Sequence, residues 1–438
     1  MLIVHYWQRS PLRFSLLIAA ITASNVLEGI GLGMLLPVIE QIQGKGSPES
    51  KFARLIADSY DMIGLPWTLE SVLGGMCVVF LVKGMVALGI RRVIANEAAS
   101  LQHELRTTLL RHLMSAELNF VQGKRIGDHL NSLTAESMRA ATALFLSAQW
   151  LSALLSTLAY LTVALAISAS LAITATLLAI AVFHPLSFIA RAAVRFGQRI
   201  AEVNENLHHH LVEALQAIKL IKSAGLQEQF LQRLDHLSLD QRYWYARSVM
   251  NTNSIQIYGQ TLGAIFLAVL LVVASRQGIS LAEQGVFLFA FLRLLPAIQQ
   301  LHGFRNDINA NVPGYQKVFT STVDAKAAGE RMTGKSITGV KHGVELKQIC
   351  VAYGDHDVLS DVTLAVRRGE TVAVVGPSGA GKTTLVDTLL GLVKPRSGMV
   401  VIDGLNLEEI SLHSWRNRVA YVSQEVFLFN DSIRNNIT

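Results

Sequence analysis

The stretch TVAVVGPSGAGKTTLVDTLLGL (residues 371–392) contains the pattern G-x-x-x-x-G-K-[ST], which is typical of a phosphate-binding loop. A β-branched run at residues 371–375 precedes the loop, and a helix-forming run follows it. The pattern requires this order of strand, loop and helix. We therefore predict that this part of the chain binds the phosphates of a nucleotide.

Each residue type in the loop has a physical role toward phosphate. Glycine lets the backbone turn its N–H groups inward, and the N-terminus of the following helix adds about half a positive charge. Lys382 would reach the β- and γ-phosphates, and the hydroxyl of Thr383 would bind Mg²⁺. The residues expected to contact the nucleotide are Gly376, Pro377, Ser378, Gly379, Ala380, Gly381, Lys382, Thr383 and Thr384.

The composition places most of the chain in a membrane. Of its 438 residues 51% are hydrophobic and 16% charged, against about 25% charged in typical soluble domains, and the mean hydropathy is +0.38. A spanning helix needs about 20 apolar residues, and residues 140–190, which carry no charge, suffice for two. We predict six spans, from these charge-poor stretches: residues 14–39, 71–90, 140–190, 248–275 and 285–304.

The basic residues predict the orientation of the spans. Lysines and arginines gather in residues 91–137 and 191–247, which places both segments in the cytosol. Both termini are then cytoplasmic, and the phosphate-binding loop lies where ATP is. These basic segments account for the net charge of +6, so we expect no nucleic-acid partner. We expect a multi-pass protein of the bacterial cytoplasmic membrane.

Two segments predict helices that continue from the spans into the cytosol. Residues 93–114 and 202–237 are periodic, charged and nearly free of proline and glycine. Glycines at 123 and 127 interrupt the first pair of such helices, and Gly225 interrupts the second. With the phosphate-binding loop, this organisation resembles the exporter-type ATP-binding cassette family along essentially the whole chain.

Three further stretches carry the resemblance. Tyr353 in ICVAYGDHDVLSDVTL lies where the family stacks an aromatic ring on adenine. Gln424 in VAYVSQEVFLFNDSIRNNI follows a predicted strand and matches the glutamine that senses Mg²⁺ and the γ-phosphate. The adjacent FLF (residues 427–429) resembles the surface on which a coupling helix rests.

The resemblance implies a fold, two cofactors and a partner. We expect an all-α transmembrane domain with six helices at residues 1–310, a linker at 311–343, and the N-terminal part of an α/β P-loop nucleotide-binding domain at 344–438. ATP and Mg²⁺ are the implied cofactors, with Thr383 and Gln424 toward the metal. A second copy of the subunit is the implied partner, so that each ATP lies between two subunits.

The same resemblance predicts what is missing from these residues. The family's LSGGQ-type signature, the strand with its Mg²⁺-coupled aspartate and water-polarising glutamate, and the switch histidine do not occur after Gln424. We therefore expect these 438 residues to bind ATP, through Lys382 and Gln424 among others, without hydrolysing it alone.

The expected activity is ATP-driven export or flipping of a lipid-like or amphiphilic substrate. The alternative, from another functional class, is an ATP-binding membrane regulator without turnover. The stretches NVLEGIGLGMLLPVIEQI (residues 25–42) and FLRLLPAIQQL (residues 291–301) look similar to exporters that flip lipid-linked oligosaccharides or other glycolipids. Drugs, peptides and other lipids stay open as substrates.

Two other clusters have structural explanations. The triplet of His208, His209 and His210 lies on a predicted helix, where successive side chains point about 100° apart and do not converge on one metal ion. The run RYWYAR (residues 242–247) precedes the fifth span, which is typical of an interfacial aromatic belt. Cys77 and Cys350 indicate neither a disulfide nor a metal site.

Charges inside the predicted spans are candidates for function, because each costs about 3 kcal/mol to insert. At a rise of about 1.5 Å per residue, Glu28 lies at a depth closer to that of Arg293 than to that of Lys83. We therefore predict a Glu28–Arg293 pair, which either fixes the helices or yields Arg293 to an anionic headgroup. Two interpretations of Lys83 stay open: its long stem snorkels toward the interface, or it faces a cavity or a partner.

Overall fold

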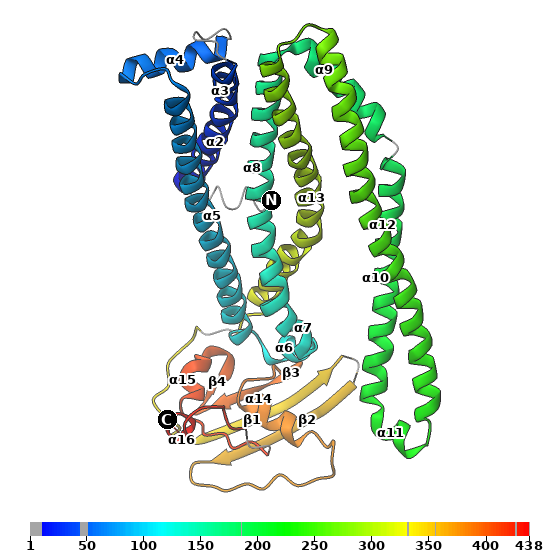
Figure 1. Cartoon of the computed structure of the whole chain (residues 1–438). Helices are drawn as coiled ribbons and strands as arrows, with labels where there is room; N and C mark the ends of the chain where they lie inside the picture. The colour runs from blue at the N-terminus through cyan, green and yellow to red at the C-terminus, as the bar shows by residue number, and fades with distance from the viewer. Residues whose placement is uncertain are drawn as a thin grey trace. The chain divides into compact units, whose positions relative to one another are not determined.

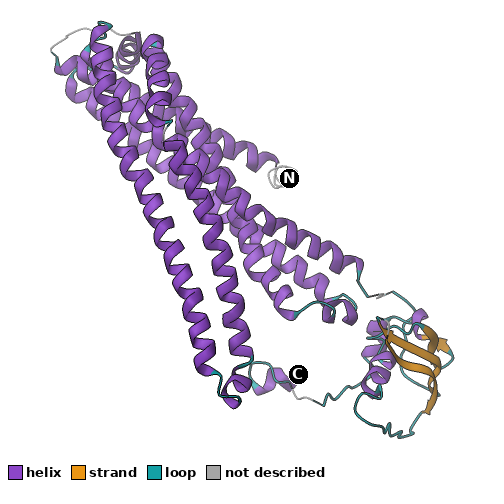
Figure 2. Cartoon of the chain, turned by 90° about the vertical axis from the view of Figure 1, so that its right-hand side faces the viewer, coloured by secondary structure: helices purple, strands orange, loops and turns teal. Residues whose placement is uncertain are grey.

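The computed structural model describes residues 11–43, 51–184, 186–330, 333–354, 356–424 and 427–437. The chain divides into two compact units. One unit comprises Val93–Ser147 and the described residues from Asn306 on, and the other comprises the described residues up to Arg92 and Ala148–Arg305. Figure 1 labels the helices and strands and colours the strands as the C-terminal part of the chain, and Figure 2 shows that the strands lie together in one sheet.

Long helices form the N-terminal three quarters of the chain, as the apolar periodicity predicts. The longer ones are α2 (Pro11–Gly33), α5 (Leu69–Met114), α8 (Ser137–Ile167), α9 (Ala169–Phe183), α10 (Leu186–Gln216), α12 (Gln227–Arg276) and α13 (Leu281–Ala327). The shorter ones are α3 (Leu35–Ile42), α4 (Lys51–Ile63), α6 (Leu118–Gln122), α7 (Ile126–Asn131), the π-helix η1 (Ser132–Glu136) and α11 (Ile218–Ser223). Because α13 continues to Ala327, the first part of the expected linker is helical.

The described residues contain five helical stretches that are long and apolar enough to cross a membrane, so the count of six spans is not confirmed. These stretches are Pro11–Ile42, Leu69–Met114, Ile126–Ala166, Ile257–Arg276 and Glu283–Ala327. The expected fourth span coincides with the shorter apolar helix Ala169–Val182. In the sequence Pro185 follows soon after this helix, and proline has no N–H with which to continue it.

The shorter apolar helix is packed nonetheless. Ala172 and Ala175 of α9 are buried in one cluster with Phe266 of α12 and Phe287 and Phe291 of α13. The rings of Phe266 and Phe291 stack with centroids 4.5 Å apart. Small residues let helices approach closely in a membrane. This packing places α9 within the unit that contains Ala148–Arg305, which we call the membrane unit.

The predicted helical extensions beyond the apolar stretches are present. The helix α5 runs without interruption through residues 93–114, and α12 begins at Gln227, well before its apolar part. Between α5 and α8 the chain forms α6, α7 and η1, and between α10 and α12 it forms α11. Gly225 ends α11 with φ of +67°, a conformation that glycine adopts without strain.

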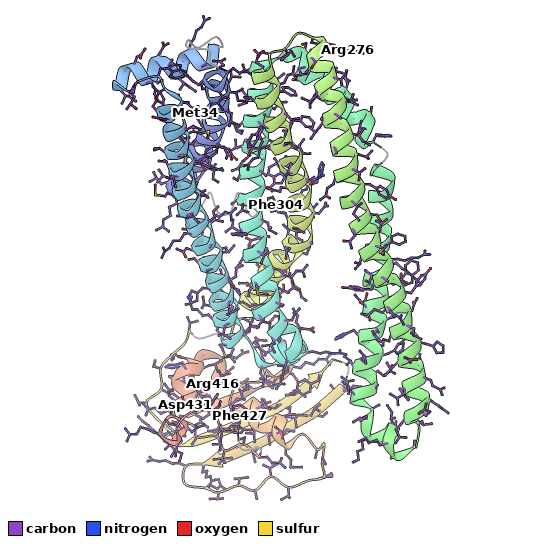
Figure 3. The ribbon with its side chains drawn as sticks, viewed as in Figure 1. Met34, Arg276, Phe304, Arg416, Phe427 and Asp431 are labelled. Carbon is purple, nitrogen blue, oxygen red and sulfur yellow. The ribbon has the colours of Figure 1, made fainter. Side chains whose placement is uncertain are left out.

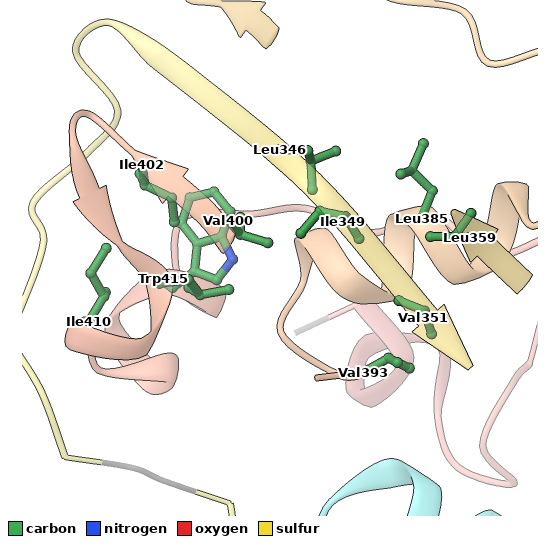
Figure 4. Packing of buried hydrophobic residues seen from close by; sticks show 11 residues of the cluster. Leu346, Ile349, Val351, Leu359, Leu385, Val393, Val400, Ile402, Ile410 and Trp415 are labelled. Atoms are coloured by element: carbon green, nitrogen blue, oxygen red, sulfur yellow. The ribbon is translucent and has the colours of Figure 1, made fainter. Parts of the chain in front are cut away.

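The C-terminal part folds around a four-stranded antiparallel sheet. Its strands are β1 (Gly343–Tyr353), β2 (His356–Arg367), β3 (Ser397–Ile402) and β4 (Leu405–Asn406), in the order β2-β1-β3-β4. The helices are α14 (Lys382–Leu389), the 3-10 helix η2 (Leu407–Glu409), α15 (Leu412–Arg416) and α16 (Ile433–Ile437). Figure 4 shows the core beneath the sheet, where Trp415 packs with Val400 and Ile402.

Two expected strands do not form in this part. Residues 371–375 and 418–423 are irregular, although both are rich in β-branched and aromatic residues. Val375 is 89% exposed and Val422 is 92% exposed. A strand is stabilised by its ladder and by cross-strand side chains, and no described strand pairs with either segment. The prediction of a strand directly before the phosphate-binding loop, and of one before Gln424, is therefore wrong for this structure.

Candidate functional site

The phosphate-binding loop leads directly into α14, as predicted. Gly379 and Gly381 have φ of +84° and +81°, which glycine alone adopts readily. A Cβ on Gly381 would also lie 2.8 Å from Leu359 Cδ2, so a larger residue at this position would force the Leu359 side chain to shift. Leu385 N–H makes the first bond of the helix, to Gly381 O at 2.9 Å. The N–H groups before it have no acceptor within the helix, so they can bind an anion.

Lys382 already lies over the loop. Its Nζ donates to Gly376 O at 2.9 Å and to Pro377 O at 2.8 Å. These two carbonyls hold the ammonium group at the mouth of the loop, next to the N-terminus of α14. An anion bound there would meet both the ammonium charge and the helix dipole. The residues present therefore fit the triphosphate of ATP.

The opposite side of α14 anchors the loop to the core. Thr384 and Leu385 are buried, and Thr388 is fully buried with its hydroxyl donating to Thr384 O at 2.7 Å. Thr383 is exposed on the other side of the helix, where its hydroxyl is free to bind a metal ion. Burial raises the pKa of the Asp387 carboxyl in the last turn of the helix.

The other predicted nucleotide residues lie outside the loop. Tyr353 ends β1, paired with His356 of β2, and its side chain is 41% exposed. Gln424 is exposed, and the hydrogen bonds between described residues do not join it to Thr383. Phe427 and Phe429 are 76% and 69% exposed, with their rings 5.2 Å apart; Figure 3 labels Phe427. The roles of these residues stay predictions.

Comparison with known families identifies both parts of the chain. The model described as "ABC transporter transmembrane region" matches residues 15–292, and the model described as "ABC transporter" matches residues 359–437. The first match covers more than half of the chain. The chain belongs to the ABC transporter family. The predicted phosphate-binding loop and its helix lie within the second match, to a domain whose family binds ATP.

Several curated ABC transporter relatives align along most of the chain. "Heterocyst differentiation ATP-binding protein HepA" of Nostoc sp. is 25% identical over 94% of this chain and 68% of its own length. An "ATP-dependent lipid A-core flippase" of Syntrophus aciditrophicus is 26% identical over 90% of this chain and 67% of its own. The flippase of the same name from Burkholderia thailandensis is 30% identical over 57% of this chain and 43% of its own. The chain thus spans roughly two thirds or less of these relatives.

The membrane unit of this ABC transporter holds a second candidate site, around Glu28 of α2. Lys83 Nζ on α5 lies 3.1 Å from Glu28 Oε2, and Tyr160 OH on α8 donates to Glu28 Oε1 at 2.5 Å. Asn25 of α2 accepts a hydrogen bond from Ser156 of α8. A buried polar seam therefore joins α2, α5 and α8.

The predicted pairing of Glu28 with Arg293 is wrong. The depth estimate set the end of each helix at its last apolar residue, but α5 continues unbroken through its charged residues, so that end is not fixed. Arg293 is exposed, and its guanidinium lies 5.5 Å from the ring centroid of Phe289 on the same helix. No carboxylate among the described residues forms an ion pair with it. Of the two interpretations of Lys83, the structure shows the one in which it has a partner.

Sequence reasoning did not find the third member of this seam. Tyr160 is the one tyrosine within the charge-free stretch 140–190, and its buried hydroxyl needs a hydrogen-bond partner. That requirement could have indicated an acceptor such as Glu28 on a neighbouring helix.

Proposed function

We propose that the chain is the ATP-binding subunit of a transporter that exports or flips a lipid-like or amphiphilic substrate across the cytoplasmic membrane. The observation that carries the proposal is the presence, in one chain, of an ABC transporter membrane region and a loop formed to bind ATP. Two of the relatives above are named lipid A-core flippases. Their names support a lipid-like substrate.

In this proposal each residue of the loop has a defined task. Lys382 exchanges the carbonyls of Gly376 and Pro377 for the β- and γ-phosphates, and the open N–H groups before Leu385 bind the remaining oxygens. Thr383 supplies its hydroxyl to Mg²⁺, the metal that ATP sites use. Tyr353 stacks on the adenine ring, and Gln424 approaches the γ-phosphate and Mg²⁺ once the site closes.

We further propose that two copies act together in the membrane, with both termini in the cytosol. The family's signature motif does not occur in these residues, so we expect hydrolysis to need groups beyond those present here. Binding would bring the nucleotide domains together, and the segments α6 to η1 and α11 would pass this movement to the spans. Hydrolysis would reset the transporter.

Arg293 supports an anionic substrate, such as a lipid-linked oligosaccharide. An arginine inside a span is costly unless it is paired, and its planar guanidinium suits phosphate and carboxylate equally well. Because Lys83 already pairs with Glu28, Arg293 can bind an anionic headgroup without breaking that ion pair.

Reconstitution into lipid vesicles tests the proposal. The complete transporter should move a fluorescent anionic glycolipid between leaflets when ATP is added. Lys382→Ala should abolish that movement, whereas Lys394→Ala should leave it unchanged, because Lys394 is exposed and pairs with Glu408 away from the loop. ATP binding without lipid movement in the unaltered protein would favour the alternative, a membrane regulator without turnover.

A further inference from the structure

The segment after α13 pairs with the segment after α5. Glu117 N–H donates to Ala328 O at 2.8 Å, and Glu330 N–H donates to Ser115 O at 2.8 Å. Between these bonds, Ala116 and Gly329 form an antiparallel bridge. The cytosolic ends of α5 and α13 are therefore tied to each other through their backbones before the chain enters the nucleotide-binding domain.

A bidentate ion pair binds the segment after α13 to the nucleotide-binding domain. Arg416 Nη1 lies 2.6 Å from Glu330 Oε2, and Arg416 Nη2 lies 3.0 Å from Glu330 Oε1. The Glu330 side chain is only 10% exposed. Paired, charge-assisted hydrogen bonds of this kind are short, directional and stronger than neutral ones. Figure 3 labels Arg416.

Arg416 also reaches the end of the helix that carries the phosphate-binding loop. Its Nη2 donates to Gly391 O at 2.9 Å and its Nε to Leu390 O at 3.3 Å. The preceding Trp415 donates its indole N–H to Leu389 O at 2.9 Å. A cation at these carbonyls is favoured, because they carry the negative end of the α14 dipole. The guanidinium thus links the C-terminus of α14 to Glu330.

A cavity of about 320 Å³ lies beside this connection and is lined by Glu117, Asn119, Thr388, Gly391 and Glu330. The segment after α13 also meets the domain further along, where Lys335 N–H donates to Glu409 O at 2.7 Å and Ile337 and Val340 pack against the core. Among the hydrogen bonds and ion pairs of the described residues, those of Arg416 are the ones that join this segment to the end of α14.

We propose that Glu330 and Arg416 are positioning residues that couple the ATP-binding loop to α13 and α5 of the same subunit. The inference rests on the proposed function. A displacement of α14 when Lys382 engages phosphate passes through Arg416 to Glu330, and from there through the paired backbone to both helices.

The test compares Glu330→Gln with the unaltered complete transporter in lipid vesicles. The amide removes the charge but keeps the size, and Arg416 keeps its bonds to Leu390 O and Gly391 O. We expect ATP affinity to stay within about twofold, while lipid moved per ATP hydrolysed falls about tenfold, the factor that corresponds to 1.4 kcal/mol. Arg416→Lys keeps the positive charge but cannot form the bidentate contact with Glu330. It should therefore lower the amount of lipid moved per ATP hydrolysed by less than Glu330→Gln does.

A matched control lies on the same segment. Lys335 and Glu409 pair at 3.3 Å with side chains 64% and 56% exposed, and exposed pairs contribute little. Glu409→Gln should leave the coupling ratio unchanged.

An unchanged ratio in Glu330→Gln and Arg416→Lys, with the unaltered protein active, would overturn the proposal. So would joint loss of ATP binding and thermal stability in both variants, which would give the pair a purely structural role. Absence of ATP-driven lipid movement in the unaltered protein would instead contradict the proposed function.

Discussion

Lys83 Nζ lies 3.1 Å from Glu28 Oε2, so an ion pair joins α5 to α2 within the membrane unit. The Glu28 side chain is 10% exposed and that of Lys83 is 26% exposed. Tyr160 from α8 satisfies the second oxygen of the carboxylate. Each of the two charges alone would cost about 3 kcal/mol inside a span. The ion pair and the hydrogen bond from Tyr160 together offset the cost of burying the two charges.

The first prediction is that Glu28→Gln destabilises the membrane unit by about 3 kcal/mol, because Lys83 is left as an unpaired charge. The measurement is thermal unfolding in detergent, followed by tryptophan fluorescence. The double variant Glu28→Gln with Lys83→Met removes both charges and should recover most of the lost stability. Equal stability of the single and double variants would show that the ion pair does not contribute.

The predicted pairing of Glu28 with Arg293 is wrong for a physical reason. A sequence gives the position of a residue along its helix but not the vertical offset between helices, and a lysine stem spans several ångströms. The loop, by contrast, depends mainly on adjacent residues. The positive φ of Gly381 and the start of α14 at Lys382 are local features, and they were predictable. The closeness of Gly381 to Leu359 of β2 is long-range and was not predictable.

Long-range features of the nucleotide-binding domain were not predictable in the same way. Glu330 and Arg416 are far apart in the sequence, and neither lies in a recognisable motif, so only the fold brings them together. Residues 371–375 show the opposite case. Their β-branched composition indicates a strand, but strand formation needs a neighbour that composition cannot supply.

The second prediction concerns Tyr353, whose ring is 41% exposed at the end of β1. If the ring stacks on adenine, Tyr353→Ala should weaken ATP binding about tenfold, since stacking on a base contributes about 1 to 3 kcal/mol. Tyr353→Phe keeps the ring and should bind ATP normally. Titration with a fluorescent ATP analogue measures both. Normal binding by the alanine variant would exclude the stacking role.

The third prediction tests the orientation of the membrane helices. In a background with Cys77 and Cys350 replaced by alanine, a cysteine at Gln277 should react with a membrane-impermeant maleimide added to intact cells. A cysteine at Ser223, at the end of α11, should react only after the cells are opened. Both positions are exposed and avoid the neighbouring positive-φ glycines. Labelling of Ser223→Cys in intact cells would contradict the cytosolic placement of the basic segments.

The turn between β3 and β4 shows how the nucleotide-binding domain fixes its first strand. Asp403 has φ of +49° and precedes Gly404, a pair typical of a tight hairpin. Its carboxylate accepts from the backbone N–H groups of Lys341, His342 and Gly343 at 2.6, 2.7 and 3.0 Å. Partial burial alone would raise the pKa of Asp403, but these three donors together outweigh burial and lower the pKa.

The last prediction follows from the sign of that shift. A carboxyl whose pKa is lower in the folded state stabilises the fold fully above its unfolded value, about pH 4, and this contribution is lost as pH falls through the folded value. Asp403→Asn, which retains tolerance for positive φ, should therefore lower stability at pH 7 by about 1 kcal/mol, the usual size for a lost hydrogen bond. The difference from the unaltered protein should stay constant between about pH 8 and 5 and shrink below about pH 4. Chemical unfolding at each pH measures it, with Asp357→Asn as control, because Asp357 is largely exposed and lies 3.9 Å from its nearest basic partner, Arg396. A difference that does not change with pH would show that the charge of Asp403 has no part in holding β1.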